Sequence, residues 1–370
     1  METYLKKICL LGLLLLFGTF IFDSKAQNPN DSCSVIRCPI ISVKIVPASY
    51  RLPNDTTSPN PSPKEKVQRN FPVFDNYLNT NTSQYDNNVS AFICNDTMYY
   101  SYQRGQYSDN DILPIASATK WLTASVIMSL VDSQKLSLDD NIGKYLPIFD
   151  QYGKGNITIR QIFSHTSGLP IDTPFDDRGG ISLQAAVDSI AIYTNLLFTP
   201  GIQAQYGSSS YKVAARIAEV IEGKLWQQIF EERIAGKCEM TNTSYSNFIN
   251  STNPHAGAGV RSTMNDYVKF LTMIYNFGVY KGVRVLTEAS VKAMELDQSN
   301  GVNSFYGLGV WRYQIVAGSA KEVSSPSATG IHPWINREKK YFGIIFTQAG
   351  FDKTINANLN FRSLVQNILN

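Results

Sequence analysis

Hydrophobic and polar positions follow three successive patterns along the chain, typical of strands, then helices, then strands again. Residues 89–94 and 97–103 are runs of aromatic and β-branched residues separated by an Asn-Asp pair, which predicts a β-hairpin. From Trp121 onward, apolar residues recur at helical spacing through the middle of the chain. The strand pattern then returns, and a terminal helix is expected from about Lys353. The C-terminal strands are expected at residues 306–314, 329–336 and 340–348.

This order of elements predicts an α+β fold. The first hairpin and the C-terminal strands are expected to share one antiparallel sheet with flanking helices. A mostly helical subdomain is expected to be inserted at about residues 132–300. Residues 54–66 are rich in Pro, Asn, Ser and Thr, which indicates a linker. The folded domain is therefore placed at residues 71–370.

Three helices in the middle of the chain have distinct patterns. The helix near Trp121 is apolar on nearly every side, which is typical of a helix packed inside a domain. Residues 206–224 and 261–278 form amphipathic helices, and both end near a glycine. Thr263 and Asp266 have the spacing of a capping box at the start of the second one.

The N-terminus has the three parts of a secretory signal peptide, assigned to residues 1–26. Lys6 and Lys7 form the positive region, residues 8–22 the apolar region, and residues 24–26 a small-residue cleavage site. The apolar run is shorter than a spanning helix needs, and no later segment is apolar for long enough. We therefore expect export to the periplasm or the medium, with no integral membrane segment after cleavage.

Residues 27–70 form a predicted N-terminal extension that contains Cys33 and Cys38. With Cys94 and Cys238 they make four cysteines in an oxidising compartment, and three pairings stay open. A metal site is not favoured, because CxxC and HExxH are absent and the three histidines lie far apart. The net charge of +3 and the scattered basic residues give no reason to expect nucleic acid. The oligomeric state is not indicated.

Ser117 and Lys120 lie at the start of the apolar helix with Ser-x-x-Lys spacing, Lys120 in its first turn, which places both side chains on one helical face. A lysine is unexpected there, because the positive end of the helix dipole and burial both disfavour its charge. The same environment lowers the pKa of the ammonium, and a neutral amine can take the proton of an attacking serine. The backbone amide of Ser117 can donate to an oxyanion. The alternative is a capping serine beside a lysine that reaches solvent.

Tyr206 lies in the loop just before the long amphipathic helix that ends near Gly223, where its phenol can face a cleft. A neighbouring ammonium would stabilise the phenolate and make Tyr206 a general base. The alternative is an aromatic side chain packed on the core, since the chain has 20 tyrosines. His165 suggests a Ser-His-Asp triad, but the GxSxG motif is absent.

Together these motifs resemble serine β-lactamases and the hydrolases related to penicillin-binding proteins, in particular the class C β-lactamase and carboxylesterase branch. The resemblance extends roughly from Val89 to Thr347. It implies a β-lactamase-like fold, with Ser117 as nucleophile, Lys120 as its activating partner and Tyr206 as the shared acid and base. It implies no metal or cofactor. The similar stretches are "IASATK", "GKYLPIFDQYGKGNITIRQIFSHTSGLP", "PGIQAQYGSSSYKVAARIAEVIE" and "GAGVRSTMNDYVKF".

Two departures from the family pattern concern substrate binding. Ser208 replaces the asparagine of the family's Tyr-x-Asn, and it is a shorter and weaker partner for a substrate amide. The family's third motif, Lys-Thr-Gly or His-x-Gly, aligns with Ser325-Pro326-Ser327, which lacks the cation that would hold a substrate carboxylate. In this register the amide of Ala328 would be the second oxyanion donor. The resemblance also makes His165 a structural residue.

The sequence therefore predicts an exported serine hydrolase that cleaves a small ester or amide through an acyl-enzyme on Ser117. Esterase activity is favoured over β-lactamase activity. Two alternatives stay open. One is a peptidase or amidase for D-amino-acid peptides, or a β-lactamase, within the same family. The other is a non-catalytic relative that binds a ligand, which the altered third motif suggests.

Overall fold

The computed structural model describes residues 66–245 and 252–369, which belong to one compact unit. Its strands are β1 (Val67–Gln68), β2 (Val89–Cys94), β3 (Met98–Arg104), β4 (Leu113–Pro114), β5 (Arg261–Ser262), β6 (Val279–Tyr280), β7 (Val283–Arg284), β8 (Trp311–Val316), β9 (Ser319–Ser324), β10 (His332–Asn336) and β11 (Tyr341–Phe346). Its longer helices are α2 (Pro72–Thr80), α3 (Thr119–Asp132), α4 (Pro147–Gln151), α5 (Ile159–Phe163), α6 (Leu183–Tyr193), α7 (Ser209–Glu222), α8 (Trp226–Phe230), α9 (Met264–Tyr275), α10 (Glu288–Met294) and α11 (Phe351–Ile368). Short helical turns are η1 (Thr82–Tyr85), η2 (Ala116–Ala118), η3 (Ile142–Lys144) and η4 (Glu231–Ala235).

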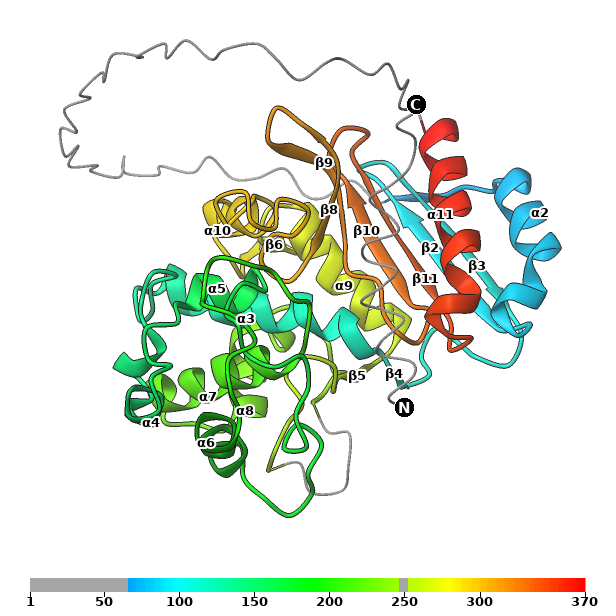
Figure 1. The fold of residues 1–370 in the computed structure, drawn as a ribbon. Coiled ribbons are helices and arrows are strands. Elements are labelled where there is room, and N and C mark those ends of the chain that lie inside the picture. The colour runs from blue at the N-terminus through cyan, green and yellow to red at the C-terminus, as the bar shows by residue number, and fades with distance from the viewer. Residues whose placement is uncertain (1–65, 246–251, 370) are drawn as a thin grey trace, which may run out of the picture. The chain divides into compact units, whose positions relative to one another are not determined.

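Seven strands form the main sheet, in the order β1-β3-β2-β11-β10-β9-β8 (Figure 1). β2 and β11 pair antiparallel, with Phe92 opposite Ile344, so the N-terminal hairpin and the C-terminal strands share one sheet. The predicted α+β fold is confirmed. The sheet was expected to be antiparallel throughout, but its edge strand β1 pairs parallel to β3. β9 was not predicted, because Val323 is its only β-branched residue, and it forms through pairing with both β8 and β10.

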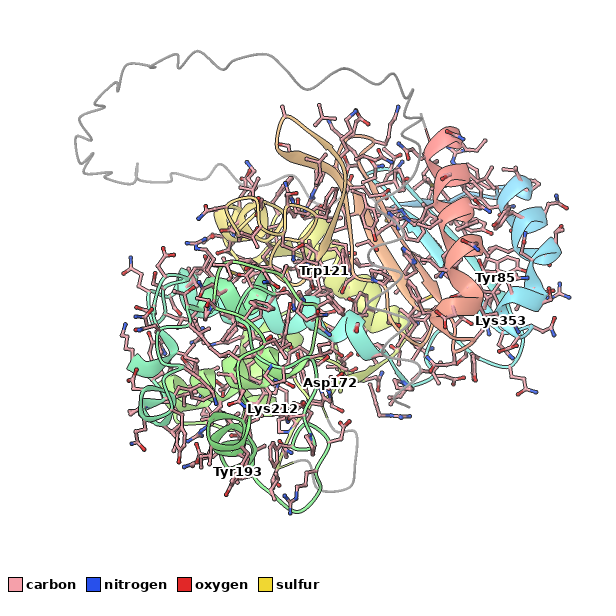
Figure 2. The ribbon with its side chains drawn as sticks, in the orientation of Figure 1. Tyr85, Trp121, Asp172, Tyr193, Lys212 and Lys353 are labelled. Atoms are coloured by element: carbon pink, nitrogen blue, oxygen red, sulfur yellow. The ribbon has the colours of Figure 1, made fainter. Side chains whose placement is uncertain are left out.

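Helices α2 and α11 cover one face of this sheet, and α9 packs on the other (Figure 1). Between α2 and α11 the rings of Phe74 and Phe361 meet, with centroids 5.7 Å apart. On the other side Trp121 of α3 packs against Phe270 of α9, at 5.8 Å. Figure 2 shows Tyr85 and Trp121 on opposite sides of the sheet. Each face of the sheet therefore has its own buried apolar cluster.

The chain between β3 and β8 folds mainly into helices α3 to α10. α3 is buried along nearly its whole length, as its apolar sequence predicts. α7 and α9 correspond to the two predicted amphipathic helices. Thr263 caps α9 by accepting a hydrogen bond from the Asp266 amide. The Asp266 carboxylate accepts from Asn242 and Thr243 instead of completing the predicted capping box.

Cys94 and Cys238 are buried free thiols, so they do not form a disulfide with each other. Cys33 and Cys38 lie outside the described residues, and so does the predicted signal peptide. The division into signal peptide, extension and a domain at residues 71–370 therefore stays a prediction. Along the described part of the chain, no helix combines the length and apolar character needed to cross a bilayer.

Candidate active site

Ser117 lies in η2, the helical turn that leads into α3, and it is partly exposed. The residue before it, Ala116, has a φ of 41°, in the left-handed region that residues with a Cβ seldom adopt. α3 begins at Thr119 with Ala118 at the N-cap position and no side-chain cap. The capping alternative for Ser117 is therefore wrong, because its hydroxyl does not close the end of α3.

Lys120, in the first turn of α3, is completely buried and directed at Ser117. Its Nζ lies 3.3 Å from Ser117 Oγ, 3.1 Å from Ser208 Oγ and 2.9 Å from the Gly257 carbonyl oxygen. The alternative of a lysine that reaches solvent is thus wrong. A carbonyl oxygen can only accept, so one N–H of Lys120 points at Gly257 in either protonation state. A neutral amine can donate to Gly257 and Ser208 and still direct its lone pair at Ser117.

Burial lowers the pKa of Lys120 from 10.5 to about 7, because removal from water disfavours the ammonium. The carboxylates of Asp172 and Asp176 act in the opposite direction by attracting the charged form. The Tyr206 ring also faces the nitrogen, with 4.7 Å from Nζ to the ring centroid. With a pKa near 7, Lys120 has a large neutral fraction at neutral pH, which is the form that can accept a proton.

Tyr206 approaches the same serine from the loop before α7. Its side chain interacts with that of Ser117, which lowers the pKa of the phenol, and its ring stacks on Trp311 with centroids 5.4 Å apart. Burial raises the pKa of Tyr206, and the interaction with Ser117 offsets this only in part. The expected phenolate is therefore disfavoured, because desolvation outweighs the interaction with Ser117. Tyr206 keeps its proton and can donate it.

His165 packs against Tyr206, with ring centroids 4.5 Å apart, and against Tyr306 at 4.6 Å. Its backbone carbonyl accepts from the amide of Gln205 at 2.9 Å, which fixes the chain just before Tyr206. Burial lowers the pKa of His165 well below its usual value, so the ring is neutral. Its Nε2 has no hydrogen-bond partner among the described residues. His165 thus supports Tyr206 by packing and does not form a triad with Ser117.

Ser208 stands at the N-cap position of α7 without capping it, and its hydroxyl accepts from Lys120 instead. Gly257 packs directly against it, and a Cβ at this position would lie 2.6 Å from Ser208 Cβ. Only glycine therefore lets its own carbonyl reach Lys120. Gly257 was not singled out in the sequence, although it opens the glycine-containing stretch "GAG" at residues 257–259. The predicted substrate role of Ser208 stays a prediction.

The segment after β9 also lies beside Ser117. Ser325 Oγ donates to the backbone carbonyl of Ser117 at 3.3 Å, so the residue aligned with the third motif does reach the site. Ala328 is exposed, and its carbonyl accepts from the Phe351 amide at the start of α11. The roles of Ser325 in substrate binding and of the Ala328 amide in binding an oxyanion stay predictions. Tyr306 and Trp311, which support Tyr206, were not predicted.

Two curated relatives illustrate how far the similarity extends. Protein Rv1367c of Mycobacterium tuberculosis is 29% identical over 278 residues, which cover 59% of this chain and 68% of that protein. The D-alanyl-D-alanine-carboxypeptidase/endopeptidase AmpH of Escherichia coli is 27% identical over 173 residues. That match covers 41% of this chain and 43% of AmpH, so it relates less than half of either protein.

Solved structures extend the comparison to the fold. A β-lactamase candidate from Bacteroides dorei superimposes with a TM-score of 0.70 and 30% identity, over 75% of this chain and 90% of that one. EstCE1, a hydrolase with promiscuous acyltransferase activity, has a TM-score of 0.66 over 78% of this chain and 96% of its own. At 15% identity, EstCE1 supports the fold alone.

The profile of the Beta-lactamase family matches residues 88–360, a range that includes Ser117, Lys120 and Tyr206. Because this match covers most of the chain, the protein belongs to the Beta-lactamase family and is a serine hydrolase with a β-lactamase-like fold.

Proposed function

We propose that this protein hydrolyses a small ester or amide through an acyl-enzyme on Ser117, with esterase activity favoured over β-lactamase activity. The observation that carries the proposal is the position of Lys120. Its Nζ lies 3.3 Å from Ser117 Oγ, in an enclosure that brings its pKa to about 7. A serine hydroxyl is a weak nucleophile, and a neutral amine at this distance is the base it needs.

In the first step the neutral Lys120 takes the proton of Ser117, and Ser117 Oγ forms a bond with the substrate carbonyl carbon. The carbonyl oxygen becomes an oxyanion, for which the amides of Ser117 and Ala328 are the proposed donors. Tyr206 then gives its proton to the leaving group as the bond to that group breaks. The Lys120 ammonium restores the proton of Tyr206, which leaves a neutral lysine and an acylated serine.

Water reverses this sequence in the second half of the reaction. A water molecule gives a proton to the pair of Lys120 and Tyr206 and attacks the acyl carbon. The bond to Ser117 Oγ breaks, and the pair returns the proton to the serine. The base in this proposal is Lys120 and the proton donor is Tyr206, since burial lowers the pKa of the first and raises that of the second.

The preference for esters rests on the segment at residues 324–330, which contains no charged residue. A β-lactam or peptide carboxylate would find no cation there, whereas a neutral ester needs none. A D-amino-acid amidase remains the second candidate, because AmpH is a carboxypeptidase and endopeptidase by name. We also propose export, on the basis of residues 1–26, which have the composition of a signal peptide.

Covalent labelling tests the proposed function. A fluorophosphonate probe is expected to label Ser117, as located by mass mapping, and Ser117→Ala is expected to be unlabelled and inactive on esters. A penicillin probe is expected to label weakly or not at all. Efficient penicillin labelling would replace the esterase assignment by a β-lactamase or peptidase. If neither probe reacts and Ser117→Ala binds ligands like the wild type, the protein is a non-catalytic relative.

The pH dependence of turnover tests the role of Lys120. Because neutral Lys120 is required and its pKa is about 7, kcat/KM for an uncharged ester should rise through pH 7 and level off above it. Below pH 6 the neutral fraction falls about tenfold per pH unit, and kcat/KM should fall with it. Initial rates between pH 5 and 9 measure this. A flat profile across that range would contradict a base with this pKa.

A further inference from the structure

Asp172 lies in a loop packed against the chain that carries Tyr206. The carbonyl of the preceding residue, Ile171, accepts a hydrogen bond from the Ser208 amide at 2.7 Å. Gly207 permits this approach, because a Cβ there would lie 2.6 Å from Ile171 Cα. Backbone contacts thus place the start of this loop beside Gly207 and Ser208, the two residues that follow Tyr206.

The same loop is fixed a few residues later by Asp176, which is buried. Asp176 Oδ2 accepts from the Thr173 amide at 2.5 Å and from the Thr173 hydroxyl at 2.9 Å. It also accepts from the hydroxyl of Ser209, in the first turn of α7, at 2.5 Å. Asp172 therefore stands between two attachments to the same segment. The backbone that carries Asp172 is thus ordered before a ligand binds, which lowers the entropic cost of pairing with it.

Asp172 is exposed, unlike Asp176, and it acts on the catalytic groups at a distance. Its carboxylate raises the pKa of Lys120 and that of Tyr206. The pKa of Asp172 is itself raised, first by partial desolvation by the surrounding chain and then by the charge of Asp176, whereas the lysine charge lowers it. Figure 2 shows Asp172 and Lys212 in the helical part of the domain, away from Tyr85 and Lys353. The ammonium of Lys212 donates hydrogen bonds to the Asn253 side chain and to the Pro254 carbonyl.

The segment after β9, which lies beside Ser117, brings no compensating charge. Ser325 contacts the Ser117 backbone, and residues 324–330 include neither a basic nor an acidic residue. Lys120 is enclosed by three oxygen atoms and is partly neutral at pH 7. Asp172 thus acts on Lys120 and Tyr206 as a negative charge, and residues 324–330 bring no positive charge to offset it.

We propose that Asp172 selects substrates that carry a protonated amine near the scissile carbonyl and disfavours substrates with a carboxylate there. The proposal rests on the proposed hydrolase function and names its substrate class. An ammonium beside Asp172 forms a charge-assisted hydrogen bond, and a carboxylate in the same place is repelled. The amine can belong to the acyl group or to the leaving group.

Matched methyl esters test the acyl side, with acid release followed at pH 7. Alanine methyl ester carries an ammonium, methyl isobutyrate has a methyl group in its place, and monomethyl methylmalonate has a carboxylate. We expect kcat/KM for the amine to exceed that for isobutyrate by about tenfold, and that for the carboxylate to be lower. Aminopropyl and butyl isobutyrate form the corresponding pair for the leaving-group side.

Asp172→Asn is expected to bring the amine-to-neutral ratio of kcat/KM to about one, and Asp172→Glu to keep it above one. Asp177→Asn removes the same charge from the same loop, but Asp177 is not among the groups that act on Lys120. It should therefore keep the ratio. Suppose that Ser117 is labelled and esters are cleaved, but Asp172→Asn still prefers the amine over the neutral ester in both substrate pairs. That result overturns the role of Asp172 and leaves the proposed hydrolase function intact. Absence of both labelling and turnover overturns the inference together with the proposed function.

Discussion

Replacing Lys120 with methionine is expected to lower kcat/KM for esters by about 10²- to 10⁴-fold, the usual contribution of a general base. Methionine fills a similar volume but leaves the Ser117 proton without an acceptor. The measurements are ester kinetics and the rate of fluorophosphonate labelling, and both should fall together. Lys120→Arg should fare no better, because a guanidinium stays charged at every pH of the assay.

Lys154→Met is the matched control. Lys154 is also a buried lysine with a lowered pKa, and it donates to the carbonyls of Ile190, Ala191 and Thr194. None of these hydrogen bonds involves Ser117, so the folded Lys154→Met variant should keep the ester kinetics of the wild type. If Lys120→Met retains turnover, or if both variants lose it equally, Lys120 is not the base.

The same substitution should change how stability depends on pH. The pKa of Lys120 is lower in the folded chain than in the unfolded chain, so between pH 7 and about 10 the unfolded chain binds more protons. Wild-type stability should therefore rise with pH in this window relative to Lys120→Met, by about 1 kcal/mol per pH unit. Urea unfolding of both proteins at several pH values measures the difference.

Replacing Arg362 with methionine is expected to destabilise the fold by about 3–5 kcal/mol. Arg362 of α11 pairs with Glu322 of β9, and both side chains are almost completely buried. Arg362 also bonds His332 Nε2 at 2.6 Å, and burial lowers the pKa of that histidine well below its usual value. Without the arginine, the one hydrogen-bond donor left to the Glu322 carboxylate among the described residues is the side-chain amide of Asn336, at 3.3 Å. A buried carboxylate without a cation accounts for the large cost.

Urea unfolding measures this effect as a fall in the midpoint at an unchanged slope. Lys292→Met is the control, because it breaks the exposed ion pair with Glu288 and should cost less than about 1 kcal/mol. The double variant Arg362→Met with Glu322→Leu should recover part of the loss, since no charge is then left buried. Equal effects of Arg362→Met and Lys292→Met would show that the buried pair contributes no more than a surface pair.

Much of the fold was predictable because its patterns are local. The hairpin of β2 and β3, the buried helix α3 and the amphipathic helices α7 and α9 each follow from the spacing of apolar residues in one short stretch. Strand β9 was not predicted, because it forms through pairing with β8 and β10 and its own residues have little strand preference. Helix α6 (Leu183–Tyr193) was also not predicted, although Ser182 caps it.

For the site, the sequence by itself determined that Ser117 and Lys120 share a helical face and that Tyr206 lies in the loop just before a helix. Only the tertiary structure decided what these groups can do. It surrounds Lys120 with Ser208 and Gly257, residues far away in the chain, and excludes water from it. Desolvation then lowers the pKa of the lysine and raises that of Tyr206, reversing the phenolate expectation. The physical reason is that residue spacing sets which groups can meet, while burial, which arises from the whole fold, sets their protonation.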